Sequence, residues 1–126
     1  MLVLDNVDAH YGKSHVLHGV SIAVRAVEVV GLLGRNGVGK TTTLKAIMGM
    51  ARRTGGRITF EGRDLHGVPP HGLAGLGIAW VPEERRIFRL LTVLENLRTG
   101  LDRPRVTPAR REELLEKVYA YFPILK

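Results

Sequence analysis

The chain has 126 residues, a length typical of one domain that buries its own core. It contains no cysteine, which excludes a disulfide scaffold and any cysteine-based metal site and is consistent with a reducing cytoplasm. Apolar residues make up 44% and charged residues 25%, the balance of a globular protein rather than a disordered one. The formal net charge of +7 predicts polyanionic ligands such as nucleotide, nucleic acid or anionic lipid headgroups.

Neither the start of the chain nor its most apolar segment has the pattern of a targeting or membrane-spanning sequence. The first residues, MLVLDNVDAHYG, contain no basic stretch followed by an apolar run, so we do not expect a secretory signal. The segment 26–33 has eight residues, includes Glu28, and falls far short of the roughly 20 residues that cross a bilayer. We therefore expect a soluble protein.

The first half of the chain predicts strands on both sides of a glycine-rich loop. Residues 1–7 and 21–24 are typical of short strands. Residues 27–33 form an almost continuous apolar run bounded by glycine, which is typical of a strand buried on both faces of a parallel sheet. Residues 57–60, followed by a Glu61-Gly62 turn, predict half of a hairpin.

The second half predicts one more buried strand, at 77–81, and several helices. The two prolines near the start of 69–76 favour a short helix there. Thr92 and Glu95 have the spacing of a capping box, and Thr107-Pro108 is a typical N-cap and first-turn pair. The helix expected from Pro108 carries one apolar stripe made of Leu114, Leu115, Val118 and Phe122.

The sequence GRNGVGKT at 34–41 matches the phosphate-loop pattern G-x-x-x-x-G-K-[ST]. Glycines let the backbone curl until successive N–H groups converge on phosphate oxygens, and the helix expected near Gly39 directs its positive dipole end at the same anion. Lys40 can reach the β- and γ-phosphates, and the Thr41 hydroxyl can ligate Mg²⁺. We therefore expect a nucleotide site made of Gly34, Asn36, Gly37, Gly39, Lys40, Thr41 and Thr42.

The rest of the sequence indicates which class of phosphate-loop protein this is. The guanine-reading N/TKxD motif of small GTPases is absent. Around the loop, the chain resembles ATP-binding cassette (ABC) ATPases over essentially its whole length, first in AHYGKSHVLHGVSIAV at 9–24. The block GIAWVPEERRIFRLLTVLENL at 77–97 resembles the second ATPase subunit of branched-chain amino acid uptake systems, and urea-type importers share much of that pattern.

The resemblance implies roles for two further residues. Tyr11 lies where the family carries an aromatic side chain that stacks on adenine, a contact worth about 1–3 kcal/mol per base. Glu83 stands where the family usually carries a glutamine that contacts Mg²⁺ or the attacking water. The implied cofactors are ATP and Mg²⁺, with Thr41 and Glu83 as the magnesium contacts, directly or through water.

The resemblance also implies the fold class and the partners. We expect an α/β P-loop NTPase fold, specifically the N-terminal half of an ABC ATPase, with an antiparallel β subdomain and the start of the parallel-sheet core and of the helical subdomain. Residues 1–90 would belong to the nucleotide-binding core and 91–126 to the helical subdomain. The implied partners are a second ABC ATPase subunit, identical or related, the membrane permease and, indirectly, a solute-binding protein, which places the chain in the cytoplasm at the inner face of the cell membrane.

Several elements of a complete ABC catalytic site are missing from the sequence. It has no LSGGQ-like signature motif. After the phosphate loop it has no apolar strand that ends in an aspartate followed by the catalytic glutamate, and it has no later histidine that would sense the γ-phosphate. We interpret the chain as part of an ATPase that, when intact, drives solute uptake, with branched-chain amino acids as the first choice of solute. The alternatives are a non-catalytic ATP-binding module and an ABC ATPase for another solute such as urea. We expect this chain alone to be inactive and poorly soluble, because strands meant for a sheet centre become unpaired edges.

Two other clusters carry no functional assignment at this level. The five histidines include an H-x-x-H at 15–18, which has no acidic or cysteine neighbour at ligand spacing along the sequence, so we do not expect a metal site there. Arg85, Arg86 and Arg89 lie in a loop without interleaved aromatic side chains. We interpret this loop as a solvated basic segment or a contact with a membrane subunit, and we expect no nucleic acid partner.

Overall fold

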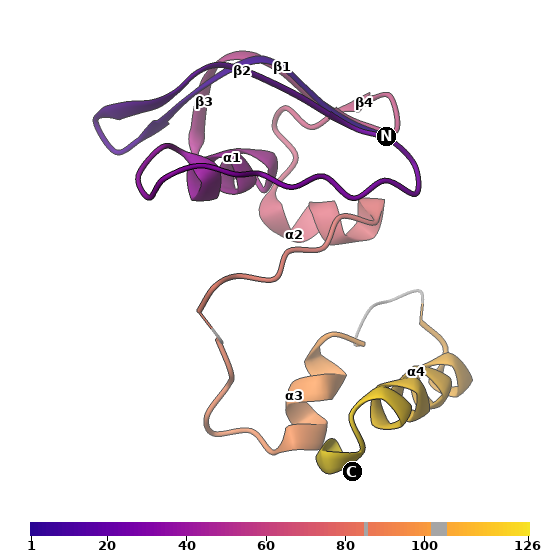
Figure 1. Ribbon diagram of the computed structural model, residues 1–126. Coiled ribbons are helices and arrows are strands. Elements are labelled where there is room, and N and C mark those ends of the chain that lie inside the picture. Colours follow the sequence, from indigo (N-terminus) through magenta and orange to yellow (C-terminus); the bar gives the residue numbers. More distant parts are fainter. Residues whose placement is uncertain (85, 102–105) are drawn as a thin grey trace. The chain divides into compact units, whose positions relative to one another are not determined.

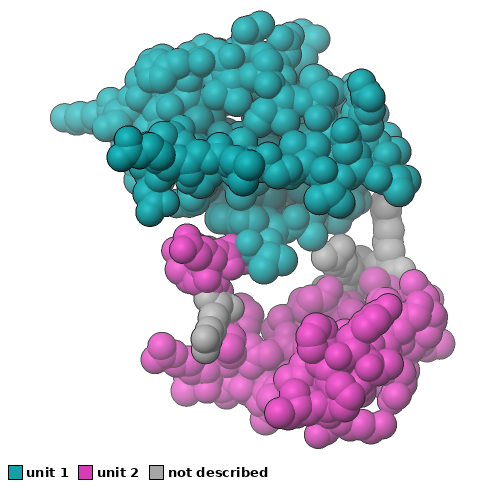
Figure 2. Space-filling view, viewed as in Figure 1, with its two compact units in different colours: residues 1–81 teal, residues 82–126 magenta. Residues whose placement is uncertain are grey.

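The computed structural model describes residues 1–84, 86–101 and 106–126, so Arg85 of the basic loop lies outside the described residues. The chain divides into two compact units, Met1–Val81 and Pro82–Lys126 (Figure 2). The first unit holds an antiparallel sheet and the phosphate loop, and the second is helical.

The sheet of the first unit has four strands in the order β2-β1-β3-β4, and every neighbouring pair is antiparallel. The strands expected at 1–7 and 21–24 both extend further, until they meet at a Gly12-Lys13 turn. The hairpin expected around Glu61-Gly62 is confirmed. The strand bounds are Leu2–Tyr11 for β1, Ser14–Val24 for β2, Arg52–Phe60 for β3 and Arg63–Asp64 for β4.

Helix α1, Lys40–Ile47, lies beneath this sheet and follows the phosphate loop directly (Figure 1). Alternate side chains of the strands face the helix and form the core, which also takes Leu73 from the short helix α2, Pro70–Leu73. A 3₁₀ turn, Ala74–Leu76, continues α2, so the helix expected over 69–76 is confirmed as two short pieces. The largest fully buried side chains are Leu17, Ile58, Leu73 and Val7.

Helix α1 packs on the sheet through small side chains. Its buried residues are Thr43 and Ala46, which let α1 approach the sheet closely, whereas Leu44 is 45% exposed.

Two sequence predictions are wrong: neither 27–33 nor 77–81 forms a strand. Val27 and Leu33 are 107% and 92% exposed, although the apolar run predicted burial. A strand in the middle of a parallel sheet needs a neighbour on each side, and the antiparallel sheet pairs neither segment with any described residue. Both segments have the apolar composition of central strands, but neither has the hydrogen-bonded neighbours that a central strand requires.

The second unit contains α3, Val93–Thr99, and α4, Pro108–Tyr121, followed by a 3₁₀ turn, Pro123–Leu125. Both predicted N-caps are confirmed. The Thr92 hydroxyl accepts the Glu95 N–H at 3.2 Å while the Glu95 carboxylate accepts the Thr92 N–H at 2.7 Å, and Thr107 accepts the Arg110 N–H at 3.3 Å. Of the apolar stripe predicted on α4, Leu115 is buried and Phe122, just past the helix, is exposed.

Membrane-spanning helices need length and an unbroken apolar surface. Within 1–84, 86–101 and 106–126, no helix combines the two.

Candidate nucleotide site

The phosphate loop contacts the sheet at Gly39, the N-cap residue of α1. Gly39 adopts φ 100°, and a Cβ there would lie 2.9 Å from Leu17 Cδ2 of β2. The left-handed backbone favours glycine, and a Cβ would also force the buried Leu17 side chain to shift. The loop therefore passes directly against β2 before the helix begins at Lys40.

The N-terminus of α1 is open to an external acceptor. Gly39 provides no side-chain cap, and the described first turn contains no acidic residue. The first N–H groups of a helix have no intrahelical acceptor, and they carry the positive end of the helix dipole. An anion bound here would satisfy both the hydrogen bonds and the charge.

Lys40 places a second positive charge inside the curve of the loop. Its Nζ donates to the Gly34 carbonyl at 2.5 Å and to the Arg35 carbonyl at 2.7 Å. An ammonium group has three N–H donors, and these bonds use two of them. The ammonium is thus held across the loop, where the negative charge of a phosphate would be neutralised.

The threonines at the start of α1 divide into exposed and buried positions. Thr41 is exposed and Thr42 is half-buried. Thr43, which the sequence analysis did not single out, is buried; its Oγ1 and its N–H both donate to the Gly39 carbonyl, at 2.9 and 2.8 Å. A threonine four residues after the helix cap is the signal that could have identified this bond.

A cleft of about 290 Å³ lies beside the loop. It runs between β2, the segment that precedes the loop and the first turn of α1. Its lining residues are Val16, Leu17, His18, Val20, Leu32, Leu33, Val38, Gly39, Lys40 and Thr43.

Tyr11, the candidate adenine contact, lies at the end of β1 and is 57% exposed. The ammonium of Lys45, on α1, lies 4.9 Å from the centroid of its ring, the geometry of a cation–π contact. The structure therefore brings Tyr11 to the helix that the phosphate loop opens, in the same compact unit.

Glu83, the candidate magnesium contact, is exposed and belongs to the other unit, Pro82–Lys126. Its role stays a prediction. Asn96, which the sequence analysis missed, organises the segment after it: Oδ1 accepts the Phe88 N–H at 3.0 Å, and Nδ2 donates to the carbonyls of Phe88, Leu91 and Thr92. One amide side chain thus holds the 88–92 segment to the start of α3.

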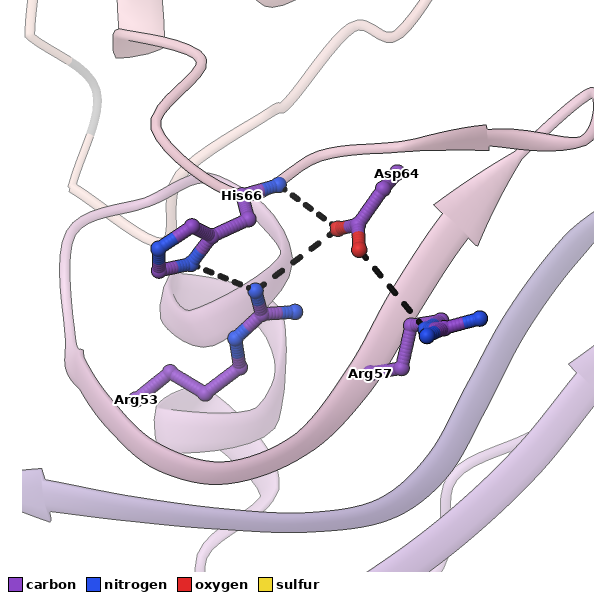
Figure 3. A network of polar contacts seen from close by, with 4 residues as sticks. All are labelled: Arg53, Arg57, Asp64 and His66. Atoms are coloured by element: carbon purple, nitrogen blue, oxygen red, sulfur yellow. Dashed lines mark hydrogen bonds and ion pairs between the residues drawn. The ribbon is translucent and has the colours of Figure 1, made fainter.

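Part of the positive charge of the chain is neutralised at the β3–β4 hairpin, away from the loop. The carboxylate of Asp64 accepts the His66 N–H at 2.8 Å and lies 3.7 Å from a nitrogen of Arg53 and of Arg57 (Figure 3). The His66 N–H contributes most to lowering the pKa of Asp64, and the two guanidinium groups lower it further. These contacts join β3 to β4 and offset part of the charge of Arg53 and Arg57.

The loop, the helix that it opens and the sheet above them define a phosphate-loop protein. The sequence model of the family described as ABC transporter matches residues 17–124. The chain therefore belongs to the ATP-binding domains of ABC transporters.

Curated relatives of different function are similar to the chain. One is the lipopolysaccharide export system ATP-binding protein LptB of Haemophilus influenzae, 40% identical over 98% of this chain and 52% of the relative. Another is the high-affinity branched-chain amino acid transport ATP-binding protein BraG of Pseudomonas aeruginosa, 45% identical over 79% of this chain and 43% of the relative. The chain spans about half the length of the curated relatives that it matches.

Solved structures agree with the fold. A structure described as the ATP-binding subunit of an ABC transporter superposes with a TM-score of 0.84 at 29% identity, over 98% of this chain and 50% of that chain. The expected fold, the N-terminal half of an ABC ATPase, is confirmed.

Proposed function

We propose that the intact protein is the ATP-binding subunit of an ABC transporter and couples ATP binding and hydrolysis to solute movement. The observation that carries this proposal is the loop at 34–41, where an uncapped helix N-terminus and the Lys40 ammonium converge. Both features favour a polyphosphate over a neutral ligand.

ATP fits the donor set of the first unit. The N–H groups of the loop and of the first turn of α1 would bind phosphate oxygens, and Lys40 would exchange its bonds with the Gly34 and Arg35 carbonyls for the β- and γ-phosphates. Tyr11 would stack on the adenine. Mg²⁺, which offsets phosphate charge when bound, would bind the exposed Thr41 hydroxyl beside Lys40. For Glu83, a role as a second magnesium contact rests on the sequence resemblance alone.

For the transported solute, we propose branched-chain amino acids. The similarity to BraG and the segment VPEERRIF with LTVLENL support this choice. LptB is equally similar over a longer stretch, so export of lipopolysaccharide is the second candidate, and a urea-type importer is a third.

As partners we propose a second cassette, identical or related, the membrane permease and, for an importer, a solute-binding protein. The exposed segment 86–91, with Ile87 62% and Phe88 58% exposed, would form part of the permease contact at the inner face of the cell membrane. The chain alone would be inactive, since it contains no signature motif or catalytic glutamate.

The proposal is tested by determining the nucleotide sequence that follows the Lys126 codon. We expect it to encode an LSGGQ-like motif, and the purified longer protein to show Mg²⁺-dependent ATPase activity that Lys40→Ala abolishes and Lys13→Ala leaves intact. Deleting the gene should reduce uptake of labelled leucine by the cells that carry it. A stop codon at that point would favour the non-catalytic ATP-binding module instead. Hydrolysis by the 126-residue chain that Lys40→Ala abolishes would show that this chain is catalytically self-sufficient. Unchanged leucine uptake would contradict only the choice of solute.

A further inference from the structure

Three potential metal ligands meet on one face of the β1–β2 hairpin. One ligand atom from each of Asp8, His15 and His18 lies within 4.8 Å of those of the other two. His15 Nε2 is 2.8 Å from Asp8 Oδ1, and the ring centroids of His15 and His18 are 3.9 Å apart. Along the sequence, the H-x-x-H pattern has no acidic neighbour at ligand spacing. The hairpin brings one to it, because Asp8 lies on the neighbouring strand β1.

An irregularity in β2 explains why the two histidines meet. Residues three apart on a regular strand point to opposite faces. In this hairpin Ala9 pairs with Leu17, but the next residue, His10, pairs with His15, so β2 contains one extra residue at Val16. Such a β-bulge reverses the alternation of the strand beyond it and turns His15 to the face of His18.

The same register places Asp8 on that face. Ala9 and Leu17 are a cross-strand pair, and both are buried in the core. Their sequence neighbours Asp8 and His18 therefore point to the opposite, outer face of the sheet. Two strands thus contribute to one cluster, with two ligands from β2 and one from β1.

The orientation of His15 is also fixed by packing. The His10 ring stacks on the His15 ring with centroids 4.5 Å apart and an interplanar angle of 3°. His10 Nδ1 is in turn 3.2 Å from Thr54 Oγ1 on β3. A third strand therefore supports the cluster, and less side-chain freedom is left to lose when the ligands close on an ion.

We propose that Asp8, His15 and His18 bind one divalent transition-metal ion such as Zn²⁺ and clamp β1 to β2. Two imidazoles and one carboxylate are a common ligand set for such ions, which leaves a fourth position for water. Tetrahedral bonds of about 2.0–2.2 Å place ligand atoms about 3.3 Å apart, so these side chains need to move by only about 1–2 Å. Imidazole ligands disfavour Mg²⁺ and Ca²⁺, which bind oxygen.

The site is tested by titrating ZnCl₂ into the 126-residue chain. Nucleotide is left out of the titration, because His18 also borders the cleft beside the phosphate loop. We expect one ion per chain, a rise in melting temperature and, with Co²⁺, visible ligand-field bands of a four-coordinate site. His15→Phe, His18→Phe and Asp8→Asn should each weaken binding at least about tenfold, since even outer-shell partners of metal sites contribute 10–100-fold.

His71→Ala serves as the control, because it removes an exposed histidine of α2 that lies outside the cluster; it should bind Zn²⁺ with unchanged affinity. His10→Phe keeps the ring stack but loses the contact with Thr54, so it should weaken binding less than the ligand variants do. When Zn²⁺ is added to the wild-type chain, the imidazole NMR signals of His15 and His18 should change their chemical shifts. This identifies the ligands even if a variant fails to fold. No saturable binding, wild-type affinity in His15→Phe and His18→Phe, or an equal loss in His71→Ala would overturn the proposal.

Discussion

The carboxylate of Glu95 closes a capping box at the start of α3. The Thr92 N–H and then the Thr92 hydroxyl lower its pKa below the ordinary value of 4.5, because both donate to the ionised form. A lowered folded-state pKa means that the contribution to stability is present above 4.5 and is lost as the pH falls through the folded value.

We therefore expect the first turn of α3 to loosen as the pH falls below 4.5, measured by amide exchange and by the NMR titration of the Glu95 carboxyl. Glu95→Gln is the matched control: glutamine can still accept the Thr92 N–H but does not titrate. The acid loosening should disappear in this variant. The same pH profile in both proteins would show that another group is responsible.

Tyr11 allows adenine recognition to be separated from phosphate binding. If its ring stacks on adenine, Tyr11→Ala should weaken ATP binding by about 1–3 kcal/mol, whereas Tyr11→Phe retains the aromatic face and most of the affinity. Binding of inorganic triphosphate, measured by the same calorimetric titration, should not change, because that ligand has no base. An equal loss for ATP and triphosphate would mean that Tyr11 supports the loop through Lys45 instead.

In the first unit, the β3 backbone approaches the β1 backbone closely at Gly56. Gly56 adopts φ 71°, and a Cβ there would collide with the backbone carbonyl oxygens of Asn6 and Asp5. Gly62, in the β3–β4 turn, has a similar φ of 76° but no atom within 4 Å of its Cβ position.

These two glycines form a matched pair. Gly56→Ala should lower the free energy of unfolding by about 3 kcal/mol, since backbone strain adds to overpacking. Gly62→Ala should lower it by only about 1 kcal/mol, the cost of the left-handed backbone alone. Denaturant unfolding followed by circular dichroism measures both; equal losses would contradict the close approach.

Elements encoded by short-range chemistry could be predicted from the sequence. The capping box at Thr92 and the N-cap at Thr107 depend on side chains within three residues, and both are as expected. The start of α1 at Lys40 follows from the loop pattern itself. The cluster of Asp8 with His15 and His18 could not be predicted, because it depends on the strand register and on a bulge at Val16.

At the scale of the whole molecule, the two wrong strand predictions have a common cause. The segments 27–33 and 77–81 have the composition of buried strands, but composition does not provide the neighbours that burial requires. The chain spans about half of its curated relatives, and the described residues pair neither segment. We propose that the remainder of the intact protein supplies the missing strands of the parallel sheet.

The central claim is that the loop at 34–41 binds the phosphates of ATP through Lys40. Lys40→Ala and Lys13→Ala each remove one positive charge, but Lys13 lies in the β1–β2 turn and Lys40 lies across the loop. Loss of a charge-assisted hydrogen bond costs about 1.5–3 kcal/mol, which is tenfold or more in affinity.

The most direct measurement is the calorimetric ATP isotherm of the wild-type chain and these two variants at one ionic strength. We predict saturable binding by the wild type and by Lys13→Ala, and a loss of at least about tenfold in affinity for Lys40→Ala. An isotherm of Lys40→Ala that matches that of Lys13→Ala would contradict the assignment of the phosphate site.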